Sequence, residues 1–257
     1  MKLNQSLSVV ALAALLAVGP LAQASTTAAG RYDSQVQAAV SEKLQKKSEF
    51  KNISSTVEDG IVTLTGQVDT YQHKLDAEKQ ARKSDKEVKG VRNLLEVSST
   101  VPDQALQQTL SRKLATDRWG YFDNAFNVVN PRVSNGVVTL TGEVADYSAL
   151  NSALSTVQRV AGVKDVVNNL TVAPASNFDD ELRFRLYRAI YGDSTLSKYS
   201  MDPAKPIRIA VNNGNIGLYG QVDNTMDKQI AEMRARGVFG GFTVENHLTT
   251  PNQVETR

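Results

Sequence analysis

The stretch DGIVTLTGQVD at residues 59–69 decides the fold, because two close copies of it follow in the same chain. The copies are NGVVTLTGEVA at residues 135–145 and NGNIGLYGQVD at residues 213–223. Their second glycine recurs at positions 66, 142 and 220, at intervals of 76 and 78 residues. Self-similarity at a nearly fixed period indicates a repeat architecture. The sequence therefore predicts three tandem copies of one module.

Each copy has the pattern of a strand, a tight turn and a second strand. The pair Asp59-Gly60, like its two equivalents, favours a two-residue hairpin loop because both residue types tolerate positive φ angles. After the turn, Val62, Leu64 and Val68 alternate with polar residues, which predicts a strand with one buried face. The glycine inside this strand is expected on the inward face, where a missing side chain lets a helix approach. A phosphate-binding role is disfavoured because no Gly-x-Gly cluster accompanies it. The structural glycines of the three copies are Gly60, Gly66, Gly136, Gly142, Gly214 and Gly220.

The segments on both sides of each hairpin change to a helical period. The preceding helix has apolar residues at Val36, Val40 and Leu44 in the first copy, and the following helix is expected to bury a second apolar stripe. A last strand ends each copy, which gives the order helix, strand, strand, helix, strand. The predicted fold class is α+β, with three small αββαβ modules in tandem, each a small mixed sheet packed on two helices. We call them unit one (31–100), unit two (103–173) and unit three (177–250). The stripes assigned to the second helix are Tyr71, Leu75 and Ala81, then Tyr147, Leu150, Leu154, Val157 and Ala161, then Met226, Ile230 and Met233.

These motifs resemble the BON domain, named for bacterial osmotically induced and nodulation proteins. Unit one departs from the pattern where Glu87 precedes Val88, and unit three departs where Gly237, Gly240 and Gly241 crowd one loop. Unit two carries the whole signature, at Gly136, Val138, Leu140, Gly142, Val144, Gly162, Val163, Val166, Asn168 and Leu170.

The resemblance implies a function in the bacterial envelope. BON modules occur in periplasmic proteins made under osmotic or envelope stress and are generally regarded as phospholipid-binding or envelope-interaction modules. We therefore expect an exported periplasmic protein that binds a phospholipid membrane surface and supports envelope and osmotic stress tolerance. The alternative is a protein-interaction or chaperone-like module without lipid binding, which would use the exposed edges of its small sheets.

The first residues have the pattern of a secretory signal peptide. Lys2 precedes an almost wholly apolar run from residue 7 to 21, and Ala22-Gln23-Ala24 supplies the small-x-small cleavage signature. We expect a signal peptide at residues 1–24 with cleavage after Ala24, and periplasmic export; an uncleaved anchor helix is the alternative. The chain contains no cysteine, so neither a lipid anchor on cysteine nor a disulfide is possible.

One aromatic segment in unit two is the first candidate for lipid contact. It contains the only tryptophan of the chain next to an arginine, and amphipathic aromatic residues prefer bilayer interfaces while a cation suits an anionic head group. The alternative is that its aromatic side chains only close the core of the unit. A second candidate is the helix that carries Arg183, Arg185 and Arg188 in unit three, although such arginines often form a solvated face. The residues predicted to bind lipid are Arg112, Arg118, Trp119, Tyr121 and Phe122.

Other function classes find little support in the sequence. Lys and Arg total 29 against 27 Asp and Glu, and each unit is nearly neutral, whereas nucleic-acid binding usually needs a strong basic excess. The two histidines, His73 and His247, lie in different units, and no carboxylate pair stands in a catalytic motif. We expect no enzymatic activity, no metal site and no cofactor.

Overall fold

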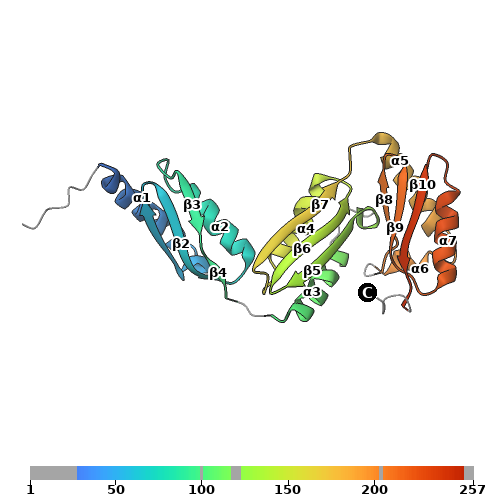
Figure 1. The fold of residues 1–257 in the computed structure, drawn as a ribbon, viewed down its shortest axis with the longest axis horizontal. Helices are drawn as coiled ribbons and strands as arrows, with labels where there is room; N and C mark the ends of the chain where they lie inside the picture. The colour runs from blue at the N-terminus through green and yellow to red at the C-terminus, as the bar shows by residue number, and fades with distance from the viewer. Residues whose placement is uncertain (1–27, 99–100, 117–122, 203–204, 252–257) are drawn as a thin grey trace, which may run out of the picture.

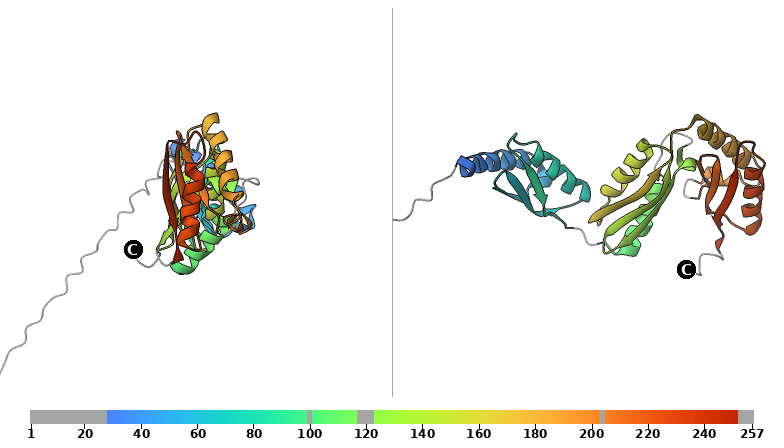
Figure 2. Two further views of the ribbon diagram at one scale, coloured as in Figure 1. Left: turned by 90° about the vertical axis from the view of Figure 1, so that its right-hand side faces the viewer. Right: turned by 45° about the horizontal axis from the view of Figure 1, so that its top comes forward.

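The computed structural model describes residues 28–98, 101–116, 123–202 and 205–251. It shows three α+β units that follow one another in a row (Figure 1). Seen along that row, the units lie behind one another (Figure 2). The predicted signal peptide, residues 1–24 with cleavage after Ala24, lies outside the described residues. Among the residues that are described, no helix is both long enough and apolar enough to cross a bilayer.

The order of elements confirms the predicted αββαβ pattern in every unit. Unit three adds one short helix between its first helix and its first strand. Unit one contains α1 (Ala28–Gln45), a 3-10 turn η1 (Ser48–Phe50), β1 (Ile53–Glu58), β2 (Ile61–Val68), α2 (Tyr71–Arg82), β3 (Gly90–Asn93) and β4 (Glu96–Val97). Unit two contains α3 (Asp103–Thr116), η2 (Asp123–Phe126), β5 (Val128–Ser134), β6 (Val137–Val144), α4 (Tyr147–Gln158) and β7 (Asp165–Val172). Unit three contains α5 (Asn177–Tyr191), α6 (Lys198–Met201), β8 (Arg208–Asn212), β9 (Asn215–Gln221), α7 (Thr225–Arg236) and β10 (Thr243–Thr249).

The three sheets share one topology, in which the second strand of each hairpin is central. β2 pairs antiparallel with β1 and parallel with β3 and β4. β6 and β9 occupy the same place between β5 and β7 and between β8 and β10. The helix that leads from the central strand to the last strand makes this parallel pairing possible, because a parallel neighbour requires a crossover connection. The expected small mixed sheet is thus confirmed.

The alternating residues of the central strands form the cores, as predicted. Val62 and Leu64 have no exposed surface and Val68 has 2%, and the equivalent residues of units two and three are equally buried. The first helix of each unit packs against them with its predicted stripe, for example Val36 and Val40. The asparagine of the last strand adds a hydrogen bond at the edge of the core: the side-chain amide of Asn93 donates to the carbonyl of Lys74 at 2.9 Å. This bond fastens the last strand to the second helix.

The second helix of unit three corrects one prediction. Met226 and Met233, which were expected in the core, are 62% and 60% exposed. The buried residues of α7 are Asp227, Ala231 and Ala235. The helix is turned because small alanines allow a close approach to the sheet and because Asp227 receives the Tyr199 hydroxyl as a hydrogen-bond donor. Tyr147 of unit two, also assigned to the buried side, is 71% exposed for the same kind of reason, since α4 buries Ala149 and Ala153 instead.

The glycine inside the central strand has a different role from the expected one. Gly66 adopts φ of 118°, in the region that favours glycine, and a Cβ placed there would lie 2.1 Å from the carbonyl oxygen of Asn52. Gly142 adopts φ of 126°, and its Cβ would lie 2.0 Å from the carbonyl oxygen of Val128. The close neighbour is therefore the backbone at the start of the paired strand, or just before it, and not a helix.

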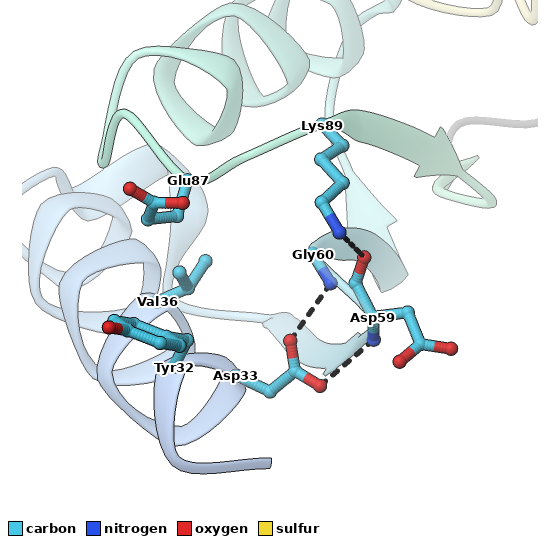
Figure 3. Close-up of a pocket in the computed structure, with 7 residues that line it drawn as sticks. All are labelled: Tyr32, Asp33, Val36, Asp59, Gly60, Glu87 and Lys89. Carbon is cyan, nitrogen blue, oxygen red and sulfur yellow. Dashed lines mark hydrogen bonds between the residues drawn. The ribbon is translucent and has the colours of Figure 1, made fainter. Parts of the chain in front are cut away.

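A carboxylate from the first helix holds the hairpin turn in all three units. In unit one, Asp33 accepts hydrogen bonds from the backbone N–H of Asp59 at 2.9 Å and of Gly60 at 2.8 Å, as Figure 3 shows. Asp103 does the same for the turn of unit two, and Asp179 for that of unit three. Each bond satisfies an N–H that the turn leaves without a strand partner. We call this pair of bonds the carboxylate clamp.

Units two and three share a hydrophobic core. Phe126 of η2 packs into the core of unit three, where its ring meets Phe184 at a centroid distance of 5.7 Å and Tyr187 at 6.2 Å, both edge to face. Next to it, the Arg208 guanidinium donates to the carbonyl of Asn127 at 2.8 Å. Burial lowers the pKa of Arg208, so this charge is partly withdrawn from water at the junction.

Units one and two meet through a smaller contact. Tyr71 of α2 packs against the cores of both units. Burial, followed by the hydrogen bond between its hydroxyl and Asp165 of β7, raises the pKa of Tyr71 to about 12. The junction between units one and two is therefore centred on one tyrosine, whereas that between units two and three contains the buried ring of Phe126 and the partly buried Arg208.

Candidate membrane-binding surface

Of the residues predicted to bind lipid, the structure describes Arg112 but not the other four. Arg112 lies exposed in the last turns of α3, where its carbonyl accepts a hydrogen bond from the hydroxyl of Thr116. Arg118, Trp119, Tyr121 and Phe122 lie outside the described residues. Their contact with lipid remains a prediction.

The arginine helix of unit three is corrected in one position. Arg183 is 4% exposed, and its guanidinium donates to Asp180 at 2.5 Å and to the carbonyl of Val211 at 2.6 Å. It is therefore a structural residue that ties α5 to β8. Arg188 is exposed, and Arg185 is half-buried at the end of the unit where the hairpin turn lies.

That end of unit three carries a group of exposed phenylalanines. Phe178 begins α5 next to the clamp residue Asp179, while Phe239 and Phe242 belong to the loop between α7 and β10. Their exposed fractions are 45%, 90% and 75%. We call these three residues, together with Arg185, the aromatic end.

Local hydrogen bonds fix the shape of the aromatic end. The backbone N–H of Phe242 donates to the carbonyl of Gly214 at 2.8 Å, and its ring covers that turn glycine. The Arg185 guanidinium donates to the carbonyl of Phe239 at 2.9 Å. A Cβ added to Gly240 would lie 3.3 Å from the ring of Phe178. The loop is thus folded down onto α5, with two of its rings directed to solvent and a cation beside them.

The equivalent ends of units one and two carry lysines where unit three carries Phe242, although Tyr32 of unit one, next to the clamp residue Asp33, is 57% exposed. The backbone N–H of Lys89 in unit one and of Lys164 in unit two makes the bond that Phe242 makes in unit three. In unit one the Lys89 ammonium donates to the carbonyl of Asp59 at 3.0 Å, at the edge of a shallow pocket of about 80 Å³ that Glu87 also lines (Figure 3). This pocket is too small for a ligand and contains the carboxylate clamp. Among the described residues, the exposed pair Phe239 and Phe242 is therefore special to unit three.

The described residues offer no cluster of ligands for a metal ion. Within those residues, no group of three or more His, Asp or Glu side chains could hold a metal ion. His73 packs edge to face on Phe50 in unit one, whereas His247 stacks on Tyr219 in unit three at 4.8 Å. The two imidazoles thus belong to separate aromatic contacts.

Comparison with known proteins identifies the repeated unit. The profile of the BON domain family matches residues 32–99, 102–174 and 192–252, which together make up most of the chain. The chain belongs to the BON domain family. Each match overlaps one of the units described above, and the third match begins after α5. The family is non-catalytic; that this chain has no enzymatic activity stays a prediction.

Individual similar proteins are more distant. An uncharacterized protein from the gshII 5′ region of Anaplasma centrale is 29% identical over 141 residues, which cover 53% of this chain and 91% of that protein. The C-terminal domain of CdsD, a structural protein of the type III secretion system of Chlamydia trachomatis, is 13% identical, with 83% of this chain and 96% of that domain covered and a TM-score of 0.25. The PrgH periplasmic domain is 12% identical, with 78% and 95% covered and a TM-score of 0.21. Similarities this weak support no inference about function.

Two features of the structure were missed in the sequence, and both had a visible signal. The clamp aspartates Asp33, Asp103 and Asp179 stand at the same place in the three copies, at the start of the first helix. Aligning the copies beyond the hairpin would have found them. The aromatic end was missed because Phe239 and Phe242 frame the glycine pair that was taken only as a departure from the family pattern.

Proposed function

We propose that this BON domain protein is exported to the periplasm, where it binds the surface of anionic phospholipid membranes and supports envelope and osmotic stress tolerance. The observation that carries the proposal is the aromatic end of unit three. Grouped exposed apolar side chains mark interaction sites, and phenylalanine beside a cation suits the boundary between acyl chains and anionic head groups.

The energetics of the aromatic end fit reversible membrane binding. Complete burial of one Phe side chain is worth roughly 1.5–3 kcal/mol, and one cation near an anionic surface adds about 1 kcal/mol. Phe239 and Phe242 together with Arg185 thus supply about 4–7 kcal/mol before the cost of immobilisation. Because the cost of immobilisation reduces this gross gain, the aromatic end alone supports reversible binding and not permanent anchoring.

A vesicle sedimentation assay tests the proposal. The chain from residue 25 onward is mixed with vesicles of phosphatidylglycerol and phosphatidylcholine, and with vesicles of phosphatidylcholine alone. We expect binding to the anionic vesicles that weakens with added salt. The double variant Phe239→Ser/Phe242→Ser should bind at least about tenfold more weakly, since the loss of about 1.4 kcal/mol corresponds to a factor of ten.

Tyr147→Ser is the matched control, because Tyr147 is similarly exposed, at 71%, but lies on α4 of unit two. It should bind like the unchanged protein. Trp119→Ala tests the segment predicted in unit two and should weaken binding if that segment also touches lipid. If neither the double variant nor Trp119→Ala changes binding, both proposed contacts are wrong.

A protein-binding role is the second candidate, and the sheet edges favour it. β7 pairs only with β6 among the described strands, along all eight of its residues from Asp165 to Val172, so its outer edge offers backbone groups to an extended peptide. Val167 in this strand is 42% exposed. A chaperone-like activity predicts that the chain suppresses aggregation of a denatured protein without any lipid, a result that the membrane proposal does not require.

A further inference from the structure

The exposed side of α7 that carries Met226 and Met233, which we call the helix crest, leads along the chain into the aromatic end of unit three. We propose that unit three binds the membrane with α7 lying along the surface, so that Met226 and Met233 enter the lipid interface together with Phe239. This inference rests on the proposed function and adds the orientation of the unit and two further contact residues. A unit that stood upright on its aromatic end would keep both methionines in water.

The two methionines lie on one side of the helix. They are seven residues apart, which is nearly two turns, so their side chains point in the same direction about 10 Å from each other. Both are more than half exposed, on the side opposite to the buried Ala231 and Ala235. α7 also lies at the far end of the row of units (Figures 1 and 2).

The repeats themselves provide a comparison for these positions. The three second helices are aligned by their N-caps, since Thr70, Asp146 and Asn224 each accept a hydrogen bond from the N–H three residues later. In this alignment the position of Met226 is occupied by Gln72 in unit one and by Ser148 in unit two. The same alignment gives Lys79 and Ser155 for Met233. The loop after the helix is aligned by the N–H that donates to the turn glycine, which gives Lys89 and Lys164 for Phe242 and, three residues earlier, Lys86 and Ala161 for Phe239.

Unit three thus carries a large apolar residue at four outward positions where the other units carry seven polar residues and one alanine. The shared fold does not require apolar residues there, because units one and two build the same fold without them. Since exposed apolar surface without a partner is unfavourable in water, the difference points to a contact that unit three alone makes.

The helix crest and the aromatic end are continuous along the chain. The backbone N–H of Gly237 donates to the carbonyl of Met233 at 3.1 Å, so the loop to Phe239 leaves the helix from the turn that carries Met233. Arg234 and Arg236 in the last turn of α7 are about half exposed, and they form ion pairs with Asp193 and Glu232. Basic residues beside an apolar helix face are typical of helices that lie in the membrane interface.

The shape of this surface favours a membrane over a folded protein. The apolar side chains stand outward on a helix surface, which is convex, and on the loop that follows it, and Met226, Met233, Phe239 and Phe242 are each more than half exposed. A soft lipid interface receives convex apolar groups without a matching shape, whereas a folded partner must supply a complementary groove.

Site-specific fluorescence tests the orientation. Because the chain has no cysteine, a single introduced cysteine can carry an environment-sensitive dye such as NBD. The labelled variants are Met226→Cys, Met233→Cys and Phe239→Cys, and the matched controls are Gln72→Cys and Ser148→Cys at the equivalent place in units one and two. With phosphatidylglycerol vesicles we expect a blue shift and a several-fold rise in emission at the three unit-three positions and no change at the controls.

Each outcome separates the inference from the proposed function. If the dye at position 239 responds while those at 226 and 233 do not, unit three stands upright and the inference is overturned, but membrane binding stands. If the dyes at 226 and 233 respond to added unlabelled chain without vesicles, the crest is a contact between copies and the inference is also overturned. If no dye responds and no chain sediments with vesicles, the proposed function fails with it.

Discussion

The carboxylate clamp of unit three predicts a large loss of stability for Asp179→Asn. Asp179 is completely buried and accepts two backbone bonds of 2.8 Å, from Asn213 and Gly214. Asparagine has the same shape, but its amide offers one acceptor atom and turns an NH2 group toward the second N–H. One charge-assisted bond is lost and one N–H is left without an acceptor in a dry site, which costs about 2–4 kcal/mol of unfolding free energy.

The same substitution in unit one is an internal control of different burial. Asp33 makes the equivalent bonds, but it is only half-buried, so water can replace the lost bond and Asp33→Asn should cost about 1 kcal/mol. Hydrogen exchange followed by mass spectrometry measures the opening free energy of β8 and β9 in one variant and of β1 and β2 in the other. Equal costs in the two units, or a cost below about 0.5 kcal/mol for Asp179→Asn, would refute the reasoning from burial.

Three further predictions concern the packing between and within units. Phe126→Ala should lower the unfolding free energy of unit three by about 3 kcal/mol although the residue belongs to unit two. The exposed Tyr147→Ala should change the unfolding free energy by less than about 0.5 kcal/mol. Unchanged hydrogen exchange in α5 of the Phe126→Ala variant would contradict the first prediction. Gly66→Ala should lower the unfolding free energy by more than about 2 kcal/mol, because Gly66 has a positive φ and lies close to the Asn52 carbonyl. Gly90→Ala in the same unit, where a Cβ meets nothing within 4 Å, should be nearly neutral when both variants are compared by thermal denaturation. Burial first, and then hydrogen bonds to carboxylates, raise the pKa values of Tyr71 and Tyr199 to about 12 from 10.0. Since the folded chain favours the protonated phenols, their contribution to stability is complete below pH 10 and is lost between pH 10 and 12. In an alkaline titration, Tyr71→Phe should remove this pH dependence from the contact between units one and two.

The hairpins and the first helices were predictable because their signals are local and repeated. The turn pair Asp59-Gly60 has positive φ at both residues, as the sequence required. The alternation around Val62 fixes which face is buried, since a shift by one residue would expose the whole set. Such features depend on neighbours within a few residues, and three copies of the pattern make the prediction specific.

The rotation of α7 was not predictable from periodicity. Met226, Ile230 and Met233 form a regular apolar stripe, but the side of the helix that packs is set by Ala231 and Ala235, which let α7 come close to the sheet. Hydrophobicity alone ranks methionine above alanine, whereas packing distance favours the smaller side chain. A stripe of large apolar residues can thus serve either a core or a partner, and only tertiary contacts decide between them.

The contribution of Phe126 to unit three was also beyond sequence reasoning. Phe126 stands 58 residues ahead of Phe184 in the chain, and no local pattern links the two. Two aromatic residues of different repeats can meet only after both repeats have folded and docked, so this contact belongs to the arrangement of units and not to any one of them.

Phe126 of unit two completes the core of unit three. Units two and three therefore form one mechanical body, and unit one forms another. Cleavage of the short link between units two and three would leave a cavity in the core of unit three and an exposed Phe126 on unit two, and both fragments would tend to aggregate. A cut between units one and two would remove little more than the docking of one tyrosine. Deletion experiments should therefore keep residues 101–251 together.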